Sequence, residues 1–466
     1  MATSSRYNKS RASTYKSSSW KSLFQKEDWW AIWLGVGLVL AAVFFFQAGS
    51  SIKWIAVIPA KWNTLSEAFA GLWAHAGQFI ALFAMWAVLF GISAKALGFR
   101  LEYFLKSFVF VYVVSVLIFL LGQWTQADRY NLEPPLVALA LGLLISNTVG
   151  LPKWMDAGFR VEYYIKTGIV LLGATLPFTL IIWAGPVAIL QASIVSILTF
   201  AVIYFAGVKF GLDRRLAATL GAGGDICGVS GAIAVAGAVG AKKEHAPIAI
   251  TLVIFWAIIM IFVLPLASRA LGLPTGVAGA WIGTSEFADA AGFAAAQTYA
   301  GYAGNIPGIN GTPEAAVNAF TLMKVIGRDV WIGIWAFILS IVAITRWEST
   351  GVRRKPDAGE IWRRFPKFVL GFLIASAIIT ALASSVSLVD YRKVLTPEVV
   401  APIKNLRTWA FIFCFLSIGL TTRVREFASS GARPFWAFTI GVIVNVILGY
   451  FLSAVVFVQH WTNLGQ

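Results

Sequence analysis

The chain has 466 residues, of which 59% are hydrophobic and 12% are charged, and its formal net charge is +16. Soluble domains carry about twice that share of charged residues, so a soluble enzyme, a disordered protein and a disulfide scaffold are all excluded. Both cysteines, Cys227 and Cys414, lie inside apolar runs and indicate no compartment. Three widely separated histidines and the lack of any metal-ligand spacing predict no metal site and no bound cofactor.

Thirteen apolar segments are long enough to cross a bilayer, which takes about 20 residues of helix. Three of them are weak because they are short, rich in glycine or contain acids. The sequence therefore predicts an all-α polytopic membrane protein with about thirteen transmembrane helices. The segments lie near 29–49, 72–94, 104–122, 135–149, 167–183, 187–208, 216–240, 248–267, 277–297, 315–345, 368–388, 405–421 and 434–457.

The basic residues predict the orientation. Residues 1–28 are rich in serine and basic side chains and are predicted to be a disordered cytoplasmic tail. When the spans alternate from that tail, 26 of the 37 Lys and Arg residues fall on the cytoplasmic side, nine on the outer side and two within a span. This bias predicts a bacterial inner-membrane protein with a cytoplasmic N-terminus, a periplasmic C-terminus and a cytoplasmic loop at 346–367. Topology thus explains the net charge, and no nucleic-acid partner is expected.

A short sequence similarity between two parts of the chain indicates an internal repeat. Gly173-Ala174-Thr175 ends one apolar segment and Gly419-Leu420-Thr421 ends another, and a further apolar segment follows each. The two copies are seven spans apart. An odd step gives them opposite orientations, as inverted repeats of secondary transporters require.

The first candidate site is a glycine-rich stretch around Asp225. Five glycines lie between positions 221 and 231, and each is unfavourable in a helix by about 1 kcal/mol relative to alanine. Close helix packing would explain the glycines, but an acid in the bilayer normally faces a polar cavity. We expect an interruption near Gly223–Gly228, within about 10 Å of Lys324, a span of roughly two helical turns, with freed amides that attract anions. The candidate anion contacts here are Gly223, Gly224, Cys227, Gly228 and Ser230.

The second candidate site contains Glu286 and Asp289, with Thr284 beside them. On a helix, two acids three positions apart share a face and can hold or exchange a proton or Na⁺. The alternative is that 277–297 is a surface loop with two solvated acids.

A polar stripe on an apolar helix is the third candidate site. Asn318, Thr321 and Lys324 are spaced by three, and Arg328 follows four residues later. Lys324 would recognise an anionic substrate or form a structural ion pair with one of the acids.

In this order, the three stretches resemble the YeiH-type sulfate exporter family, over roughly 130–457. Segment 29–122 looks like extra N-terminal transmembrane helices, and many members have Ser where this chain has Asp225. Through a wider similarity to sodium/proton antiporters and bile-acid transporters, the resemblance implies inverted repeats and broken helices that cross in mid-membrane. The matching runs are Gly221-Ala222-Gly223, Ile226-Cys227-Gly228, Ile282-Gly283-Thr284, Val317-Asn318-Ala319 and Ile418-Gly419-Leu420-Thr421-Thr422.

Together these observations predict a secondary transporter of a small anion, such as sulfate, sulfite or an organosulfonate. Lys324 and the amides of Gly224–Ser230 would attract the anion, with Thr175, Thr284, Asn318 and Thr421 as further contacts. Asp225, Glu286 and Asp289 would carry the coupling H⁺ or Na⁺. The alternatives are a monovalent cation/proton antiporter and a non-transporting receptor or scaffold. No soluble domain is long enough for a catalytic core, so an enzyme is not expected, and a homodimer remains open.

Overall fold

The computed structural model describes residues 23–127, 134–176, 178–242, 244–347, 366–386, 390–423 and 431–464. These residues fold into helices joined by turns, and among them the only β pairing is an isolated bridge between Trp62 and Trp124. Residues 1–22 of the tail predicted to be disordered (1–28), and nearly all of the predicted loop 346–367, lie outside the described residues. The last two residues of that tail, Glu27 and Asp28, are helical rather than disordered.

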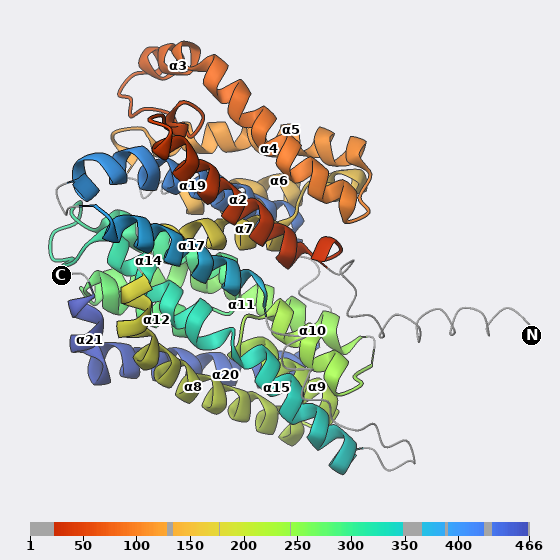
Figure 1. Ribbon diagram of the computed structural model, residues 1–466. Coiled ribbons are helices and arrows are strands. Elements are labelled where there is room, and N and C mark those ends of the chain that lie inside the picture. Colours follow the sequence, from red (N-terminus) through yellow and green to blue (C-terminus); the bar gives the residue numbers. More distant parts are fainter. Residues whose placement is uncertain are drawn as a thin grey trace, which may run out of the picture.

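The helices follow one another along the described chain (Figure 1). The first half contains α2 (Glu27–Gln47), η2 (Ile52–Trp54), α3 (Leu65–Ala74), α4 (Ala76–Ala96), α5 (Leu101–Gly122), α6 (Pro134–Thr148), η4 (Lys153–Ala157), α7 (Val161–Gly173), α8 (Phe178–Lys209), α9 (Arg214–Asp225) and α10 (Val229–Ala238). The second half contains α11 (His245–Ala270), α12 (Thr275–Ser285), α13 (Asp289–Tyr302), α14 (Pro313–Thr321), η5 (Leu322–Arg328), α15 (Trp331–Val342), η6 (Ala343–Trp347), α17 (Phe368–Ser384), η7 (Tyr391–Val400), α19 (Ala401–Thr421), α20 (Ala432–Phe451), η9 (Leu452–Val456) and α21 (Val458–Asn463).

Eight helical stretches of the described chain are long and apolar enough to cross a membrane, and three shorter apolar helices accompany them. Each of the thirteen predicted segments overlaps helix in the part of the chain that the structure describes, although the number of membrane crossings stays a prediction. The eight stretches are Glu27–Gln47, Ala76–Ala96, Leu101–Gly122, Phe178–Lys209, His245–Ala270, Pro313–Trp347, Lys393–Thr421 and Ala432–Val456.

One predicted boundary is wrong. The segments 167–183 and 187–208 were expected to be separate, but α7 ends at Gly173 and a single α8 runs from Phe178 through Pro186 to Lys209. Proline removes one backbone donor from a helix, and long apolar helices tolerate that loss where their neighbours compensate for it.

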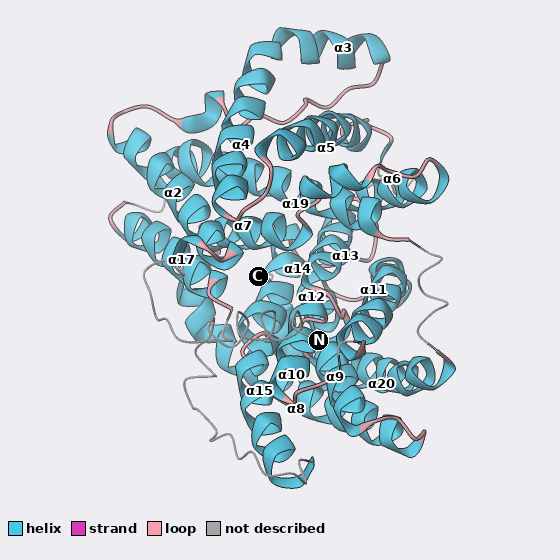
Figure 2. Cartoon of the chain, turned by 90° about the vertical axis from the view of Figure 1, so that its right-hand side faces the viewer, coloured by secondary structure: helices cyan, strands magenta, loops and turns pink. Residues whose placement is uncertain are grey.

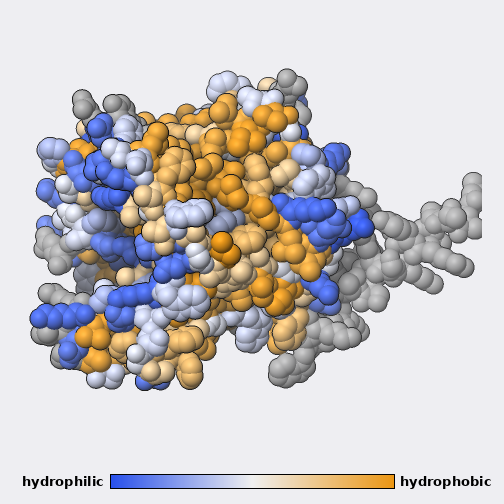
Figure 3. All heavy atoms as spheres, turned by 90° about the horizontal axis from the view of Figure 1, so that it is seen from above, coloured by the Kyte–Doolittle hydropathy of each residue, from blue (hydrophilic) through white to orange (hydrophobic). Residues whose placement is uncertain are grey.

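The surface has the polarity of a protein that spans a membrane. Figure 3 shows an apolar belt between two polar ends, and large side chains such as Ile80, Phe205 and Ile447 are each more than 60% exposed. Soluble monomers rarely expose contiguous apolar patches of this extent. The start of α2 and helix α21 lie at opposite ends of the molecule (Figure 1).

The helices pack as two groups, visible in Figures 1 and 2. We call α2–α7, α17 and α19 the aromatic body, because stacked and edge-on rings fill it. Trp409 stacks on Tyr112 with 5.1 Å between ring centroids, and Phe413 lies edge-on to Phe108 at 5.3 Å. We call α8–α15, α20 and α21 the broken-helix body, with α13 and α14 at the boundary. Phe293 of α13 contacts Phe411 of α19 across that boundary.

Candidate functional site

The helix around Asp225 is interrupted, within the stretch where the glycines predicted it. Helix α9 ends at Asp225 and α10 begins at Val229. Between them Gly228 has a φ of +74°, which glycine adopts without strain. A Cβ at this position would lie 2.7 Å from the carbonyl oxygen of Phe287. This interruption therefore packs directly against a second one.

The second interruption separates α12 from α13. Glu286 and Ala288 have extended backbones, and the Oε1 atom of Glu286 accepts hydrogen bonds from the amides of Phe287 (2.9 Å) and Ala288 (3.2 Å). Every residue of α12 is buried, and Glu286 is fully buried. The alternative that 277–297 forms a surface loop with solvated acids is therefore wrong.

Two buried cations join these interruptions. Lys324 and Arg328 lie on η5, a π-helical segment that continues α14, and both are 0% exposed. The Nζ atom of Lys324 donates to the carbonyl oxygens of Ile226 and Glu286, at 2.8 Å each. Both interruptions are thus bonded by one ammonium group.

The Arg328 guanidinium makes the corresponding bonds to the ends of α9 and α12. Its Nε donates to the Asp225 carbonyl (2.9 Å) and an Nη atom to that of Gly224 (3.1 Å). Its other Nη donates to the carbonyls of Thr284 (2.7 Å) and Glu286 (3.1 Å). The last carbonyls of a helix lack intrahelical partners and carry partial negative charge, so a cation stabilises them.

The three predicted coupling acids do not share one position. The Oδ2 of Asp225 accepts a hydrogen bond from Ser196 on α8. The Glu286 carboxylate instead accepts hydrogen bonds from backbone amides of its own interruption, between α12 and α13. Asp289, the first residue of α13, lies 3.7 Å from the Lys324 Nζ through its Oδ1. Of the three, only Asp289 forms an ion pair with Lys324 among the described residues.

Asp329, which was not among the predicted site residues, lies near Asp289, with a carboxylate oxygen of each within 4.8 Å of the other. In an α-helix, residue i+5 points away from residue i, but a π-turn takes in one more residue and brings it back to the same side. The amide of Asp329 donates to the carbonyl of Lys324 at 3.0 Å, which is the i to i+5 bond of a π-turn. The sequence gives no signal for this switch in helix geometry.

A cavity of about 280 Å³ opens at this centre. Cys227 and Ser230 line it from the start of α10, and Asp289 and Asp329 line it from α13 and the end of η5. No side chain that the structure describes caps the first turn of α10, so its amides point toward this end of the helix without such an acceptor.

The mouth of the cavity is formed with the aromatic body. Lys166 of α7 pairs with Asp28 of α2 (2.9 Å) and Glu162 (3.5 Å), and both Lys166 and Asp28 line the cavity. The neighbouring Lys367 donates its backbone amide to Asp28 at 3.0 Å. Burial, with a smaller contribution from the Lys26 ammonium, lowers the pKa of Lys367 to about 8. The first turn of α2, which the sequence did not predict to be near the site, thus contributes an acid to it.

The remaining predicted contacts divide into two sets. Gly223, Gly224 and Thr284 are buried around the interruptions, and Asn318 is partly buried on α14. Thr175 and Thr421 lie elsewhere: Thr175 accepts a hydrogen bond from Arg407 and lines a different cavity. Thr421 is exposed and bonds the Ser417 carbonyl of its own helix.

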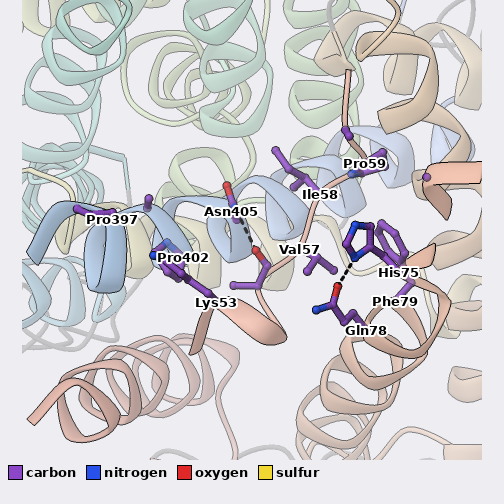
Figure 4. Close-up of a pocket in the computed structure, with 14 residues that line it drawn as sticks. Lys53, Val57, Ile58, Pro59, His75, Gln78, Phe79, Pro397, Pro402 and Asn405 are labelled. Atoms are coloured by element: carbon purple, nitrogen blue, oxygen red, sulfur yellow. Dashed lines mark hydrogen bonds between the residues drawn. The ribbon is translucent and has the colours of Figure 1, made fainter. Parts of the chain in front are cut away.

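Another cavity, of about 320 Å³, lies between α19 and the N-terminal helices (Figure 4). There Asn405 donates to the Ala56 carbonyl (2.8 Å), and His75 is paired with Gln78 (2.7 Å). None of the buried charges at the interruptions lines it.

The fold and the centre define a multi-pass α-helical membrane protein in which two interrupted helices meet around buried cations. The chain belongs to the family described as Conserved hypothetical protein 698, whose profile matches residues 106–438. That match begins inside α5, after α2–α4.

Named relatives agree that this is a family of membrane proteins. The chain is 33% identical to a UPF0324 membrane protein of Nitratidesulfovibrio vulgaris, over 81% of this chain and 63% of the relative, so it spans less than two thirds of that protein. It is 30% identical to a UPF0324 membrane protein of Rhodopirellula baltica, over 88% and 73% of the two chains. It is 27% identical to one of Nitrosomonas europaea, over 88% and 91%. No solved structure matches the chain.

Proposed function

We propose that this chain is a secondary active transporter that moves a small anion across the bacterial inner membrane by alternating access. The observation that carries this proposal is the meeting of two interrupted helices at the Lys324 ammonium, beside a cavity. Interrupted helices buried at membrane depth are tolerated where they line a cavity, and they form the substrate sites of many secondary transporters. The start of α2 would face the cytoplasm and α21 the periplasm.

An anion suits the α10 end of the cavity. The uncapped amides of Val229 and Ser230 present the positive end of a helix dipole. Lys166 lines the same cavity but is paired with Asp28 and Glu162, so these amides would supply the attraction. Sulfate, sulfite and organosulfonates, the substrates that the sequence resemblance implies, are the first compounds to test.

The acids in the cavity provide the coupling. Ionised Asp289 and Asp329 would repel an anion, so the anion and a neutralising H⁺ or Na⁺ bind together more favourably than either binds alone. Reciprocal stabilisation of this kind links the movement of the anion to the gradient of the cation.

Flux measurements in proteoliposomes test the proposal. With an outward proton or Na⁺ gradient, the purified chain should move radiolabelled sulfate or sulfite, and Asp289→Asn should remove the dependence on the gradient. Glu314→Gln, a change at an acid that pairs with Lys404 at the surface, is the matched control and should leave flux unchanged. Movement of every tested anion at the rate of empty liposomes would contradict the proposal.

A monovalent cation/proton antiporter is the second candidate, because neither carboxylate oxygen of Asp329 has a hydrogen-bond partner in the described part of the chain and the acid is free to bind a cation. The same liposomes separate the two functions. Exchange of Na⁺ for H⁺ that needs no added anion would identify the antiporter.

A further inference from the structure

The two interruptions and the π-helix bring three metal-ligating side chains together from distant parts of the chain. Cys227 lies between α9 and α10, Asp289 begins α13, and Asp329 follows η5. Their ligand atoms all lie within 4.8 Å of one another. Sulfur and oxygen ligands of a tetrahedral zinc ion lie about 3.6 Å apart, given bond lengths of about 2.3 and 2.1 Å. Small side-chain movements would therefore close this set around one ion.

The Asp329 carboxylate independently indicates a missing partner. It is 0% exposed, and neither of its oxygens has a hydrogen-bond partner among the described residues. The nearby cations have other partners: Lys324 bonds two carbonyls, and Lys166 pairs with Asp28 and Glu162. A buried acid without a hydrogen bond is strongly unfavourable unless an ion compensates for it. Asp329 also lines the cavity, through which an ion could reach it.

We propose that Cys227, Asp289 and Asp329 form a binding site for a divalent transition-metal ion. Thiolate and carboxylate ligands together favour Zn²⁺ or Co²⁺ over Mg²⁺ and Ca²⁺, which prefer oxygen ligands alone. Three protein ligands leave one tetrahedral position open toward the cavity, as in sites where the metal or its fourth ligand exchanges.

The charges support this assignment. A thiolate and two carboxylates carry three negative charges, and a divalent ion together with the Lys324 ammonium, 3.7 Å from Asp289, neutralises them. Arg328 is separately compensated by the carbonyls at the ends of α9 and α12. A metal in this place would balance the charges of its three ligands and Lys324. The inference goes beyond the proposed function and does not depend on which solute the protein moves.

Cobalt titration of the purified full chain, in detergent and without a histidine tag, tests the site. We expect one Co²⁺ per chain with a thiolate-to-cobalt charge-transfer band in the near ultraviolet. Zn²⁺ should displace it, and Mg²⁺ should not. Cys227→Ser should abolish the band, and Asp329→Asn should weaken binding by at least about tenfold, the lower end of the loss seen even for residues that only support metal ligands. Cys414→Ser removes the other, fully buried cysteine and is the matched control.

Several results would overturn the site. They are the absence of a thiolate band in the wild-type chain, a band that survives Cys227→Ser, or equal Co²⁺ affinity in Asp329→Asn and wild type. Each variant is first compared with wild type by size-exclusion profile and thermal unfolding, and Asp289→Asn, a change at a partly exposed ligand, replaces Asp329→Asn if the latter does not fold. Because binding is measured without flux, failure of the metal site leaves the transport proposal standing, and the reverse also holds.

Discussion

The two bodies of this molecule bury their interiors in different ways. The aromatic body is filled by rings: Trp86 stacks on Phe90 at 4.8 Å between centroids, and Phe413 packs against five other aromatic rings. The broken-helix body instead buries charged side chains and the two helix interruptions. At its centre Lys324 and Arg328 bond the backbone carbonyls of these interruptions. Lipid is as apolar as a leucine side chain, so helices in a membrane associate through packing and hydrogen bonds. The first body relies on packing and the second on polar bonds.

This difference indicates that the aromatic body acts as a scaffold and that the broken-helix body contains the groups available to ligands. Dense ring packing resists displacement, since a packed interior has no room for small shifts. Backbone groups freed by an interruption, in contrast, remain available to ligands where a cavity reaches them. The molecule concentrates these groups where its two bodies meet.

Removal of Arg328 should have the largest effect of any single substitution considered. Arg328→Gln leaves the carbonyls at the ends of α9 and α12 without their cation, and we expect a loss of stability of about 3–5 kcal/mol, as for other broken buried charge contacts. Thermal unfolding in detergent measures it. Arg100→Gln, a change at an exposed guanidinium near the start of α5, is the control. Equal melting temperatures for the two variants would mean that the interruptions are held together by other contacts.

Substitution of Gly228 should have the next largest effect. Any side chain at a positive φ costs about 1–2 kcal/mol, and at Gly228 an added Cβ also meets the carbonyl of Phe287. Gly304 has nearly the same φ, +76°, but no atom within 4 Å of an added Cβ. Gly228→Ala should therefore lower the melting temperature more than Gly304→Ala does. Equal losses in melting temperature would show that close contact between the two interruptions adds nothing to the cost of a side chain at Gly228.

A change in the aromatic body should affect stability alone. Phe413→Leu removes ring contacts, with an expected cost of about 1–2 kcal/mol. Co²⁺ binding and anion flux at temperatures well below unfolding should be unchanged, because no described contact joins Phe413 to the buried charges. A variant that kept wild-type stability but lost flux would reverse the roles assigned to the two bodies.

The smallest effect is expected at the surface. Lys106 pairs with Glu102 one turn earlier on α5, and both side chains are at least 60% exposed. Solvent screens such a pair, so Lys106→Gln should leave the melting temperature unchanged within error. A clear loss would indicate that this exposed pair contributes to stability despite its screening by solvent.

Composition and periodicity were enough to predict the helical class, the membrane setting and the position of the first interruption. The glycines around Asp225 carried that last prediction, since so many are costly in a continuous helix. The polar stripe singled out Lys324, which bonds the backbone of both interruptions, although its role in function stays a prediction. The sequence did not indicate that Arg328 would contact the same two breaks, although its spacing of four from Lys324 placed both on one helix face.

The rest depended on geometry that local patterns do not encode. The π-helical η5 places Asp329 on the same side as Lys324, near Asp289, and a register change of one residue has no compositional mark. Asp28 reaches the cavity through the packing of α2 against α7, which joins residues far apart in the chain. Thr175 and Thr421 were predicted as anion contacts from a three-residue sequence similarity, and the fold places them in separate environments.

The chain's two cysteines provide the most direct test of the claim that a water-accessible cavity reaches the interruptions while the aromatic body is sealed. Cys227 lines the cavity and is 6% exposed, whereas Cys414 of α19 is 0% exposed among the rings. The measurement is the rate at which a small charged methanethiosulfonate reagent modifies each thiol, in Cys414→Ser and Cys227→Ser chains reconstituted in lipid. The account predicts that Cys227 reacts, more slowly when a bound anion or metal fills the cavity, and that Cys414 does not. Equal rates, or faster modification of Cys414, would contradict it.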